Sequence, residues 1–226
     1  EDSSLLIKNN TVIVPIPVIG AAGLTIQNES IIKENSKKFQ KLLQEEHNNK
    51  LPNRVLIPLN LGNRHWIAID LIQDLVSTKM GSMRFNGYIY DTLGKTNYDE
   101  EKEYIKKFLM IALDSSININ WILRTDKSSL LNQIPRQSAG GNACGPNAAT
   151  ILAALLKSEK NISVDELLQV NVGNVKLSDL LNDDILSRSI LFEEIMDNAE
   201  SGATKSEELG RAMDIAYEEA TKMLDN

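Results

Sequence analysis

The sequence predicts an α+β fold: a small mixed sheet flanked by helices, with a helical extension towards the C-terminal end. β-Branched runs bounded by turn residues alternate with amphipathic helical patterns, and a glycine-rich loop leads directly into a strongly apolar helix. The 226 residues are 42% hydrophobic and 24% charged, which is typical of a globular protein with a sizeable core. We expect a single domain over residues 1–226, with its core at about 54–157 and the helical extension at about 162–226.

Each element is predicted from a local pattern. The segment 11–19 is β-branched and interrupted by prolines, which favours an edge strand, whereas the helices follow from the helical spacing of apolar residues. In order, the predicted elements are an edge strand at 11–19, a helix at 28–48, strands at 54–61, 65–72 and 87–91, a helix at 98–114, a strand at 117–123 and a helix at about 146–157. A polar loop is expected at 77–86.

Composition and charge argue against several classes of protein. There are 24 basic and 31 acidic residues, and the net charge of −7 argues against nucleic acid or an anionic membrane surface as the main partner. The longest apolar stretch, at about 12–24, contains two prolines and is too short to span a bilayer. The chain starts with Glu1 rather than Met, so we expect it to be a fragment of a longer protein.

Cofactor and disulfide chemistry are not expected either. A single cysteine excludes an intramolecular disulfide and fits a reducing compartment. Two histidines and one cysteine, scattered along the chain, give no metal-ligand spacing. The glycine-rich loop lacks the Gly-Lys-Ser/Thr of a nucleotide-binding loop, so we expect no metal and no cofactor.

Cys144 is the candidate nucleophile. A lone cysteine is more often a small buried hydrophobe, but this one is placed at the mouth of a helix, with Gly145 after it and Pro146 suited to the first turn. A helix N-terminus has unpaired N–H groups and partial positive charge, which favour a thiolate and can also hold an oxyanion. Gly140 and Gly141 would let a substrate approach closely.

His65 is the candidate general base. His47 stands among glutamates and asparagines at a predicted helix end, where a solvated surface histidine is expected. His65 follows a turn and begins an apolar strand beside Trp66; a hydrogen-bonded strand-end histidine is the alternative interpretation. Because a thiolate nucleophile usually needs a base, His65 and Cys144 together favour the catalytic one. Both histidines precede the cysteine, which excludes the papain order.

Asp91 is the candidate acid that orients the base. It ends the strand GYIYD, although an aspartate before Thr-Leu-Gly is also a common turn residue. Asp70 lies five residues from His65, an odd offset that puts the two side chains on opposite faces of a strand.

An oxyanion donor is expected in the glycine-rich loop 136–145. Gln137 lies seven residues before Cys144 and can present an amide N–H beside the sulfur, and Gln133 and Ser138 are weaker options.

The order His-Trp, Tyr-Asp-Thr-Leu, Gln and Asn-Ala-Cys-Gly resembles the ubiquitin-like-protein protease clan. This clan includes the SUMO and NEDD8 proteases, the adenoviral protease and bacterial effector deubiquitinases. The matching segments are RVLIPLNLGNRHWIAIDL at 54–71, YIYDTLG at 88–94 and RQSAGGNACG at 136–145. The resemblance implies a papain-like cysteine protease core in which Cys144 begins a central helix.

The resemblance also implies two sets of site residues. The catalytic set contains a nucleophile, a base, its orienting acid and an oxyanion-hole glutamine: Cys144, His65, Asp91 and Gln137. The substrate-binding set, in which an indole covers the channel for a Gly-Gly tail, is Trp66, Gly141 and Asn142.

Three departures from the family pattern favour its bacterial effector branch. Ser138 stands at the usual glutamine position, Ala143 replaces an aspartate, and the gap from His65 to Asp91 is long. With the Ile-, Asn- and Lys-rich composition, they predict a deubiquitinase secreted by a bacterium into the host cytoplasm. Its partner would be ubiquitin or polyubiquitin, with SUMO or NEDD8 as options. Segments 25–52 and 77–86 are expected to grip the modifier without a role in the core.

Other functions remain open at this point. An effector acetyltransferase of the same clan would use the same Cys144 and His65, but usually has a glutamate in place of Asp91. A caspase-like enzyme is disfavoured because its histidine lies closer to the cysteine. A catalytically decayed ubiquitin-binding module is the alternative that is not an enzyme.

Overall fold

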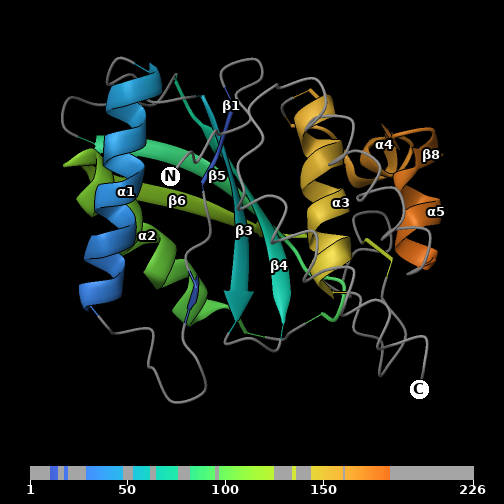
Figure 1. Cartoon of the computed structure of the whole chain (residues 1–226), viewed down its shortest axis with the longest axis horizontal. Helices are drawn as coiled ribbons and strands as arrows, with labels where there is room; N and C mark the ends of the chain where they lie inside the picture. The colour runs from blue at the N-terminus through green and yellow to red at the C-terminus, as the bar shows by residue number, and fades with distance from the viewer. Residues whose placement is uncertain are drawn as a thin grey trace, which may run out of the picture.

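The structure is a computed structural model, and it describes residues 11–14, 18–19, 29–47, 53–61, 65–75, 82–94, 97–124, 134–135, 144–159 and 161–183. In this part of the chain, one mixed sheet has the strand order β1–β3–β4–β5–β6, with β2 also paired to β3 (Figure 1). Its strands are β1 (Thr11–Ile13), β2 (Val18–Ile19), β3 (Arg54–Leu61), β4 (Trp66–Gln73), β5 (Ser82–Tyr90) and β6 (Ser116–Leu123). The helices are α1 (Glu29–His47), α2 (Asp99–Leu113), α3 (Cys144–Lys157), α4 (Val164–Leu168) and α5 (Leu177–Asn182).

The strand directions bring the start of β4 beside the end of β5. Strands β3, β4 and β5 form an antiparallel meander, whereas β1 and β2 run parallel to β3, and β6 runs parallel to β5. In the β4–β5 register Ala68 faces Tyr90. Residues just before β4 and just after β5 therefore lie next to each other, at the ends of two neighbouring inner strands. The parallel β5–β6 pair requires a crossover, which α2 provides.

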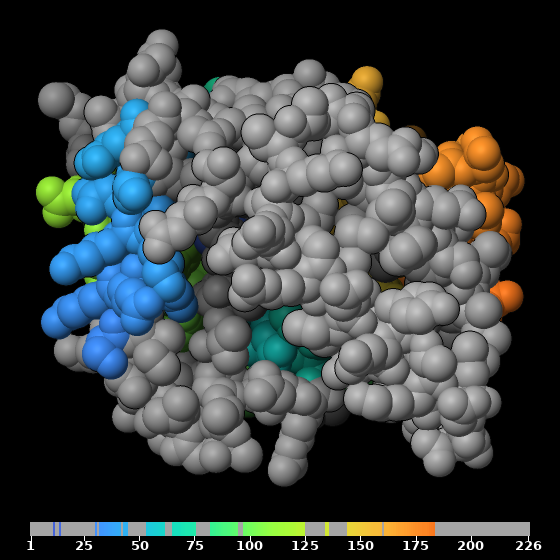
Figure 2. Space-filling view, viewed as in Figure 1, coloured from blue at the N-terminus to red at the C-terminus, as the bar shows by residue number. Residues whose placement is uncertain are grey.

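Helices cover both faces of the sheet. Helices α1 and α2 pack on one face, where Phe39 stacks on Phe108 with ring centroids 5.5 Å apart. Helix α3, with α4 and α5 beyond it, packs on the other face. Figure 2 shows α1 and the α4–α5 region on opposite flanks of the molecule. Because β3 and β4 are covered on both faces, they are apolar along nearly their whole length.

A glycine in the middle of β5 is required by a tryptophan on the neighbouring strand. A Cβ atom built on Gly87 would lie 2.7 Å from Cε3 of Trp121 and 2.8 Å from Cγ2 of Ile119. The indole therefore lies directly over the backbone of Gly87, on the face that α2 covers. Only glycine allows this close approach of side chain and strand.

Most predicted elements are confirmed. Strand β3 coincides with the predicted 54–61, and α1, β4, α2, β6 and α3 agree with their predictions to within two residues at each end. The segment 11–19 forms β1 and β2 beside β3, at the edge of the sheet as expected. The α+β class with a mixed sheet flanked by helices is also confirmed.

The prediction of a loop at 77–86 is wrong over its second half, because β5 begins at Ser82. The sequence SMRFN reads as polar, but all five residues pair with β6, Phe85 and Asn86 also pair with β4, and Phe85 is buried. Strand pairing on both sides thus overrides a weak local preference.

The expectation that segment 25–52 has no role in the core is also wrong. Helix α1 buries Ile32, Ser36, Phe39 and Leu43, and the Ser36 hydroxyl donates to the Phe108 carbonyl at 3.0 Å. The buried residues form a narrow face of α1, and the many lysines and glutamates on its outer face make the segment look like a surface helix in the sequence.

The extension is more varied than predicted. Residues 161–183 contain α4 and α5, and between them an unpredicted hairpin of β7 (Asn171–Val172) and β8 (Val175–Lys176). Residues 184–226 lie outside the described part, so the single-domain boundary stays a prediction. No helix among the described residues has both the length and the apolar character needed to cross a membrane.

Candidate active site

His65 and Asp91 lie next to each other, where β4 starts and β5 ends. His65 immediately precedes β4 and Asp91 immediately follows β5. His65 Nε2 lies 2.7 Å from Asp91 Oδ1. The Asp91 side chain is fully buried, whereas 12% of the His65 side chain is exposed. An ionised carboxylate can only accept, so Nε2 carries the hydrogen of this bond, and in the neutral form of the ring Nδ1 then carries the lone pair.

The turn after β5 holds Asp91 in place. Its Oδ1 also accepts hydrogen bonds from the backbone N–H groups of Leu93, at 2.7 Å, and Gly94, at 3.1 Å. Gly94 has a positive φ of 72°, which glycine adopts without strain. The two interpretations of Asp91 from the sequence therefore hold together, because the same carboxylate organises its own turn and contacts the histidine.

Cys144 is the first residue of α3, and its side chain is partly exposed. The start of α3 packs against Trp66, the first residue of β4. A Cβ atom built on Gly145 would lie 3.5 Å from Cδ1 of the Trp66 indole. Cys144 is the residue before Gly145, and His65 is the residue before Trp66. The thiol and the imidazole therefore each stand next to the Gly145–Trp66 contact between α3 and β4. The thiol also stands at a helix N-terminus, where free N–H groups favour negative charge.

The second ring nitrogen of His65 is open for chemistry. Nδ1 is buried and accepts no hydrogen bond from any group in the described part of the chain, the Cys144 thiol included. In cysteine and serine hydrolases without substrate, the contact of nucleophile and base is often loose. The arrangement thus has one imidazole nitrogen committed to a carboxylate and the other available near a partly exposed thiol.

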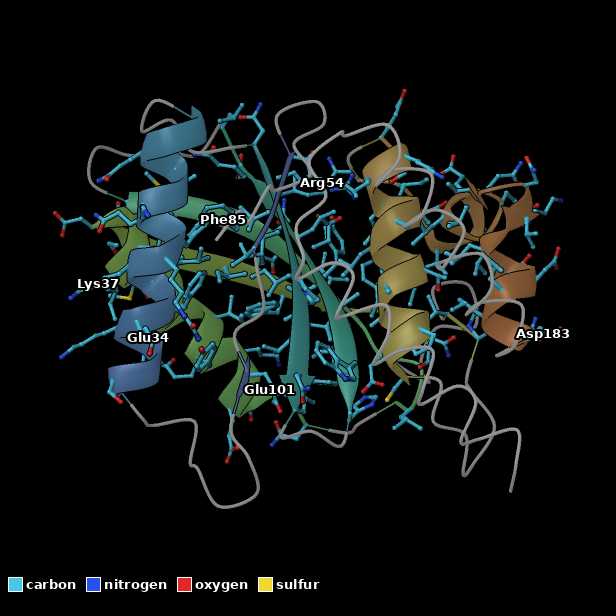
Figure 3. All side chains as sticks on the ribbon, viewed as in Figure 1. Glu34, Lys37, Arg54, Phe85, Glu101 and Asp183 are labelled. Carbon is cyan, nitrogen blue, oxygen red and sulfur yellow. The ribbon has the colours of Figure 1, made fainter. Side chains whose placement is uncertain are left out.

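Asp70, the other candidate acid, lies in the middle of β4 and is paired with Arg54 rather than with His65. Its two carboxylate oxygens accept from Arg54 Nε, at 2.8 Å, and Nη2, at 2.7 Å. Arg54 Nη1 continues to the carbonyl oxygens of Leu155, at 2.7 Å, and Ser158, at 3.3 Å, in the last turn of α3 and just beyond it. Figure 3 shows Arg54 between the sheet and α3.

Burial raises the pKa of the Asp70 carboxyl, and hydrogen bonds and charge from the Arg54 guanidinium act against that rise. This buried pair ties the C-terminal end of the Cys144 helix to β3 and β4, and we name it the Arg54–Asp70 clamp.

Several predicted site residues lie outside the described part of the chain. These are Gln137, Gly141 and Asn142, with the weaker options Gln133 and Ser138. Their predicted roles stay predictions. The side chain of His47 is likewise outside the description, although its backbone ends α1.

Sequence reasoning missed two polar residues that the fold brings to these groups. The Tyr98 hydroxyl donates to Asp91 Oδ2 at 2.6 Å, and Arg54 forms the clamp just described. A tyrosine seven residues after Asp91 gives no local signal. An arginine that begins an apolar strand does give one, because a strand covered on both faces leaves such a charge in need of a buried partner.

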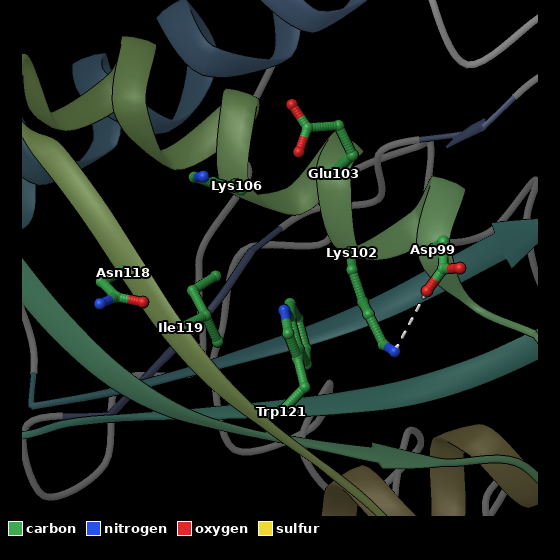
Figure 4. A pocket seen from close by; sticks show the side chains of 7 residues that line it. All are labelled: Asp99, Lys102, Glu103, Lys106, Asn118, Ile119 and Trp121. Carbon is green, nitrogen blue, oxygen red and sulfur yellow. Dashed lines mark ion pairs between the residues drawn. The ribbon is translucent and has the colours of Figure 1, made fainter.

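The α2–β6 surface contains a separate cavity of about 240 Å³ (Figure 4). Its lining residues are Asp99, Lys102, Glu103, Lys106, Asn118, Ile119 and Trp121. Lys102 Nζ lies 3.5 Å from Asp99 Oδ1 at its edge. This cavity belongs to the α2 face of the sheet and includes none of the predicted catalytic residues.

Comparison with models of known protein families gives no match, and comparison with curated protein sequences gives none either. Among solved structures, the central domain of Lpg1148 from Legionella pneumophila is similar over 84% of this chain and 89% of that chain, with 13% identity and a TM-score of 0.49. The Rickettsia bellii effector RickCE is similar over 79% and 60%, with 18% identity and a TM-score of 0.41.

The SUMO protease Ulp1, solved with its catalytic cysteine oxidised to a sulfinic acid, is similar over 76% of this chain and 68% of that chain. The identity is 14% and the TM-score is 0.36. These identities and TM-scores are too low to assign a family or an activity to the chain.

Proposed function

We propose that this protein is a cysteine protease that cleaves ubiquitin, or a ubiquitin-like modifier, after its C-terminal Gly-Gly. The observation that carries the proposal is the contact of His65 with buried Asp91, next to the helix that begins at Cys144. A thiol at a helix N-terminus, an imidazole and a buried carboxylate are the groups that thiol hydrolysis requires. In this proposal Cys144 is the nucleophile, His65 the base and Asp91 the acid that orients it.

The first half of the reaction transfers the modifier to the enzyme. His65 Nδ1 takes the thiol proton, and the thiolate sulfur attacks the carbonyl carbon of the terminal glycine. The tetrahedral oxyanion is held by N–H groups at the start of α3, with the amide of Gln137 as a further predicted donor. The imidazolium, stabilised by Asp91, then gives its proton to the departing lysine amine as the C–N bond breaks.

The second half restores the enzyme. His65 Nδ1 takes a proton from water, and the oxygen of that water attacks the thioester carbon. The C–S bond breaks, the proton on His65 returns to the Cys144 sulfur, and the modifier leaves with a free C-terminal carboxyl group, which releases the second proton of the water to solvent. Every proton taken by His65 is returned, so the cycle needs no cofactor.

The substrate assignment rests on the motif order at 54–71, 88–94 and 136–145 and on the position of Trp66. Its indole stands beside Gly145, where it would cover the approach to Cys144 and favour a tail without side chains. Gly141 and Asn142 would line the same approach. We propose ubiquitin or polyubiquitin as the partner, with SUMO and NEDD8 as options, and a bacterial effector acting in a host cell as the setting.

The test is labelling by ubiquitin, SUMO and NEDD8 probes that carry a C-terminal electrophile. We expect the ubiquitin probe to label wild-type protein at Cys144, and the Cys144→Ala variant to show neither labelling nor turnover. His65→Ala should lower kcat/KM by about 10³-fold, since general acid–base catalysis contributes on that order. His47→Ala is the matched control, because it removes the other of the two histidines, and should match wild type.

The outcomes separate the alternatives. Labelling by the SUMO probe alone would change the modifier and keep the mechanism. Transfer of an acetyl group from acetyl-coenzyme A without probe labelling would favour the acetyltransferase. If Cys144→Ala retains turnover within tenfold of wild type, the nucleophile is wrong.

A further inference from the structure

The second oxygen of Asp91 is held by a residue from outside the predicted triad. Tyr98 donates its hydroxyl hydrogen to Asp91 Oδ2 at 2.6 Å, a short bond of the kind that a charged acceptor makes. Both residues are 1% exposed, so water does not compete for this bond. Tyr98 caps the start of α2, seven residues after Asp91.

The two carboxylate oxygens have different tasks. Oδ1 accepts from His65 Nε2 and from the two turn amides, and Oδ2 accepts from Tyr98. A carboxylate group can rotate about its bond to Cβ with little resistance. Donors on both oxygens fix that rotation, so Oδ1 stays aimed at Nε2. The Tyr98 bond thus controls the orientation of the carboxylate, on which the tautomer of the imidazole depends.

We propose that Tyr98 is a positioning residue for the catalytic acid, a role that rests on the proposed function. It acts through Asp91 and does not touch the substrate, because its ring lies in the apolar core that α2 shares with the sheet. Its hydroxyl is the polar tip that reaches from this core to the site. Tyr98, at the start of α2, binds one oxygen of the Asp91 carboxylate and His65 binds the other. The position of α2 therefore affects the orientation of His65 through Asp91.

Helix α2 also has attachments that do not involve this hydroxyl. Phe108 stacks on α1, and Ile105 and Leu109 are buried in the same core. Phenylalanine fills the space of tyrosine without the hydroxyl, so Tyr98→Phe is expected to keep α2 in place and to remove a single donor. The Asp91 oxygen would then be buried without that hydrogen bond, a loss that is large for a charged group.

The chain offers a matched control in Tyr104. It lies on the same helix, is 2% exposed and accepts a hydrogen bond from Asn35 Nδ2 at 3.1 Å on its hydroxyl. Tyr104→Phe removes a buried tyrosine hydroxyl from α2 without touching Asp91. A general weakening of α2 would affect both variants, whereas a positioning role belongs to Tyr98.

The experiment compares the steady-state kinetics and melting temperatures of the two variants with wild type. We expect Tyr98→Phe to lower kcat by about tenfold or more, because the carboxylate that orients His65 loses one of the hydrogen bonds that fix its rotation. KM should stay within about twofold. The melting temperature of Tyr98→Phe should fall by roughly 3–10 °C with the lost hydrogen bond, so kcat is expressed per folded molecule by active-site titration. Turnover of Tyr98→Phe within twofold of wild type, or an equal loss in Tyr104→Phe, would overturn the proposal.

A second measurement tests Tyr98 even if no modifier is cleaved. With two histidines in the chain, a His47→Gln background leaves His65 as the single histidine, and its ¹⁵N chemical shifts report the tautomer. We expect hydrogen on Nε2 in this background and a mixture of tautomers after Tyr98→Phe. An unchanged tautomer ratio would refute the role of Tyr98, whereas failure of all modifier probes with a changed ratio would refute the substrate alone.

Discussion

Two buried aspartates, one within β4 and one just after β5, have different partners. Asp70 and Asp91 are both 1% exposed. In the middle of β4, Asp70 is paired with Arg54, a permanent charge that is also buried. Beside the start of β4, Asp91 is paired with His65, whose charge can change and whose ring is partly exposed. The remaining contacts follow the same division: carbonyl groups of α3 complete the first pair, and N–H and O–H donors complete the second.

The difference teaches that burial alone does not identify a catalytic acid. A buried aspartate paired with arginine is part of the framework, because the guanidinium stays charged and cannot pass a proton on. A buried aspartate paired with a partly exposed imidazole can direct proton transfer. Substitutions of the two aspartates should therefore affect different measured quantities.

The largest effect is expected from Asp91→Asn, measured as kcat/KM. Asparagine can keep the turn, since its oxygen can accept from Leu93 and Gly94 while its NH₂ group donates to the Tyr98 hydroxyl oxygen. It cannot stabilise an imidazolium, so kcat/KM should fall by about 10²- to 10⁴-fold with a melting temperature close to that of wild type. A drop smaller than tenfold would mean that the two aspartates do not differ in function.

Asp70→Asn should instead reduce the free energy of unfolding. It leaves the Arg54 charge buried without its counter-ion, which costs about 3–5 kcal/mol. Urea unfolding measures this loss, and titration of active sites gives the rate per folded molecule, which should change little. If Asp70→Asn lowers the rate of correctly folded molecules more than Asp91→Asn does, the assignment of the acid is wrong.

The smallest effect is expected from Gly145→Ala, a change beside Trp66 at the start of β4. The new Cβ would meet Trp66 at 3.5 Å, which is an ordinary contact, so the free energy of unfolding should change by less than about 1 kcal/mol. Gly87→Ala is the matched control, since its Cβ would lie 2.7 Å from Trp121 and should cost about 1–3 kcal/mol. Equal losses in thermal or urea unfolding would show that Trp66 and Trp121 are packed alike.

Short sequence patterns correctly predicted the strands and the turn that depend mainly on neighbouring residues. The apolar runs at 54–61 and 65–72, with turn residues between them, are enough to predict two paired strands, and the turn residues after Asp91 place it at a strand end. The close contact of His65 with Asp91 also follows once β4 and β5 are paired antiparallel. These features need only short-range pattern and one hairpin or meander.

Features that depend on distant packing could not be predicted in the same way. Arg54 meets Leu155, which lies 101 residues away in the chain, and nothing near either residue indicates the other. Tyr98 reaches Asp91 because the core between α2 and the sheet fixes the start of that helix. The first half of β5 is a strand because β4 and β6 pair with it, and a deletion of 77–86 would remove strand residues rather than a loop alone.

The Arg54–Asp70 clamp and the Trp66–Gly145 contact together fix the lengths of two segments against each other. From Trp66 to Asp70 an extended strand advances about 14 Å, and from Gly145 to Leu155 a helix advances about 15 Å. The strand segment and the helix segment thus have nearly the same length and are linked to each other by a contact near each end. One residue inserted into this part of β4 would lengthen it by about 3.4 Å and turn the Asp70 side chain to the other face, so the clamp and the Trp66–Gly145 contact could not both form. The spacing of the thiol and the imidazole is therefore a property of segment length as well as of the residues at the site.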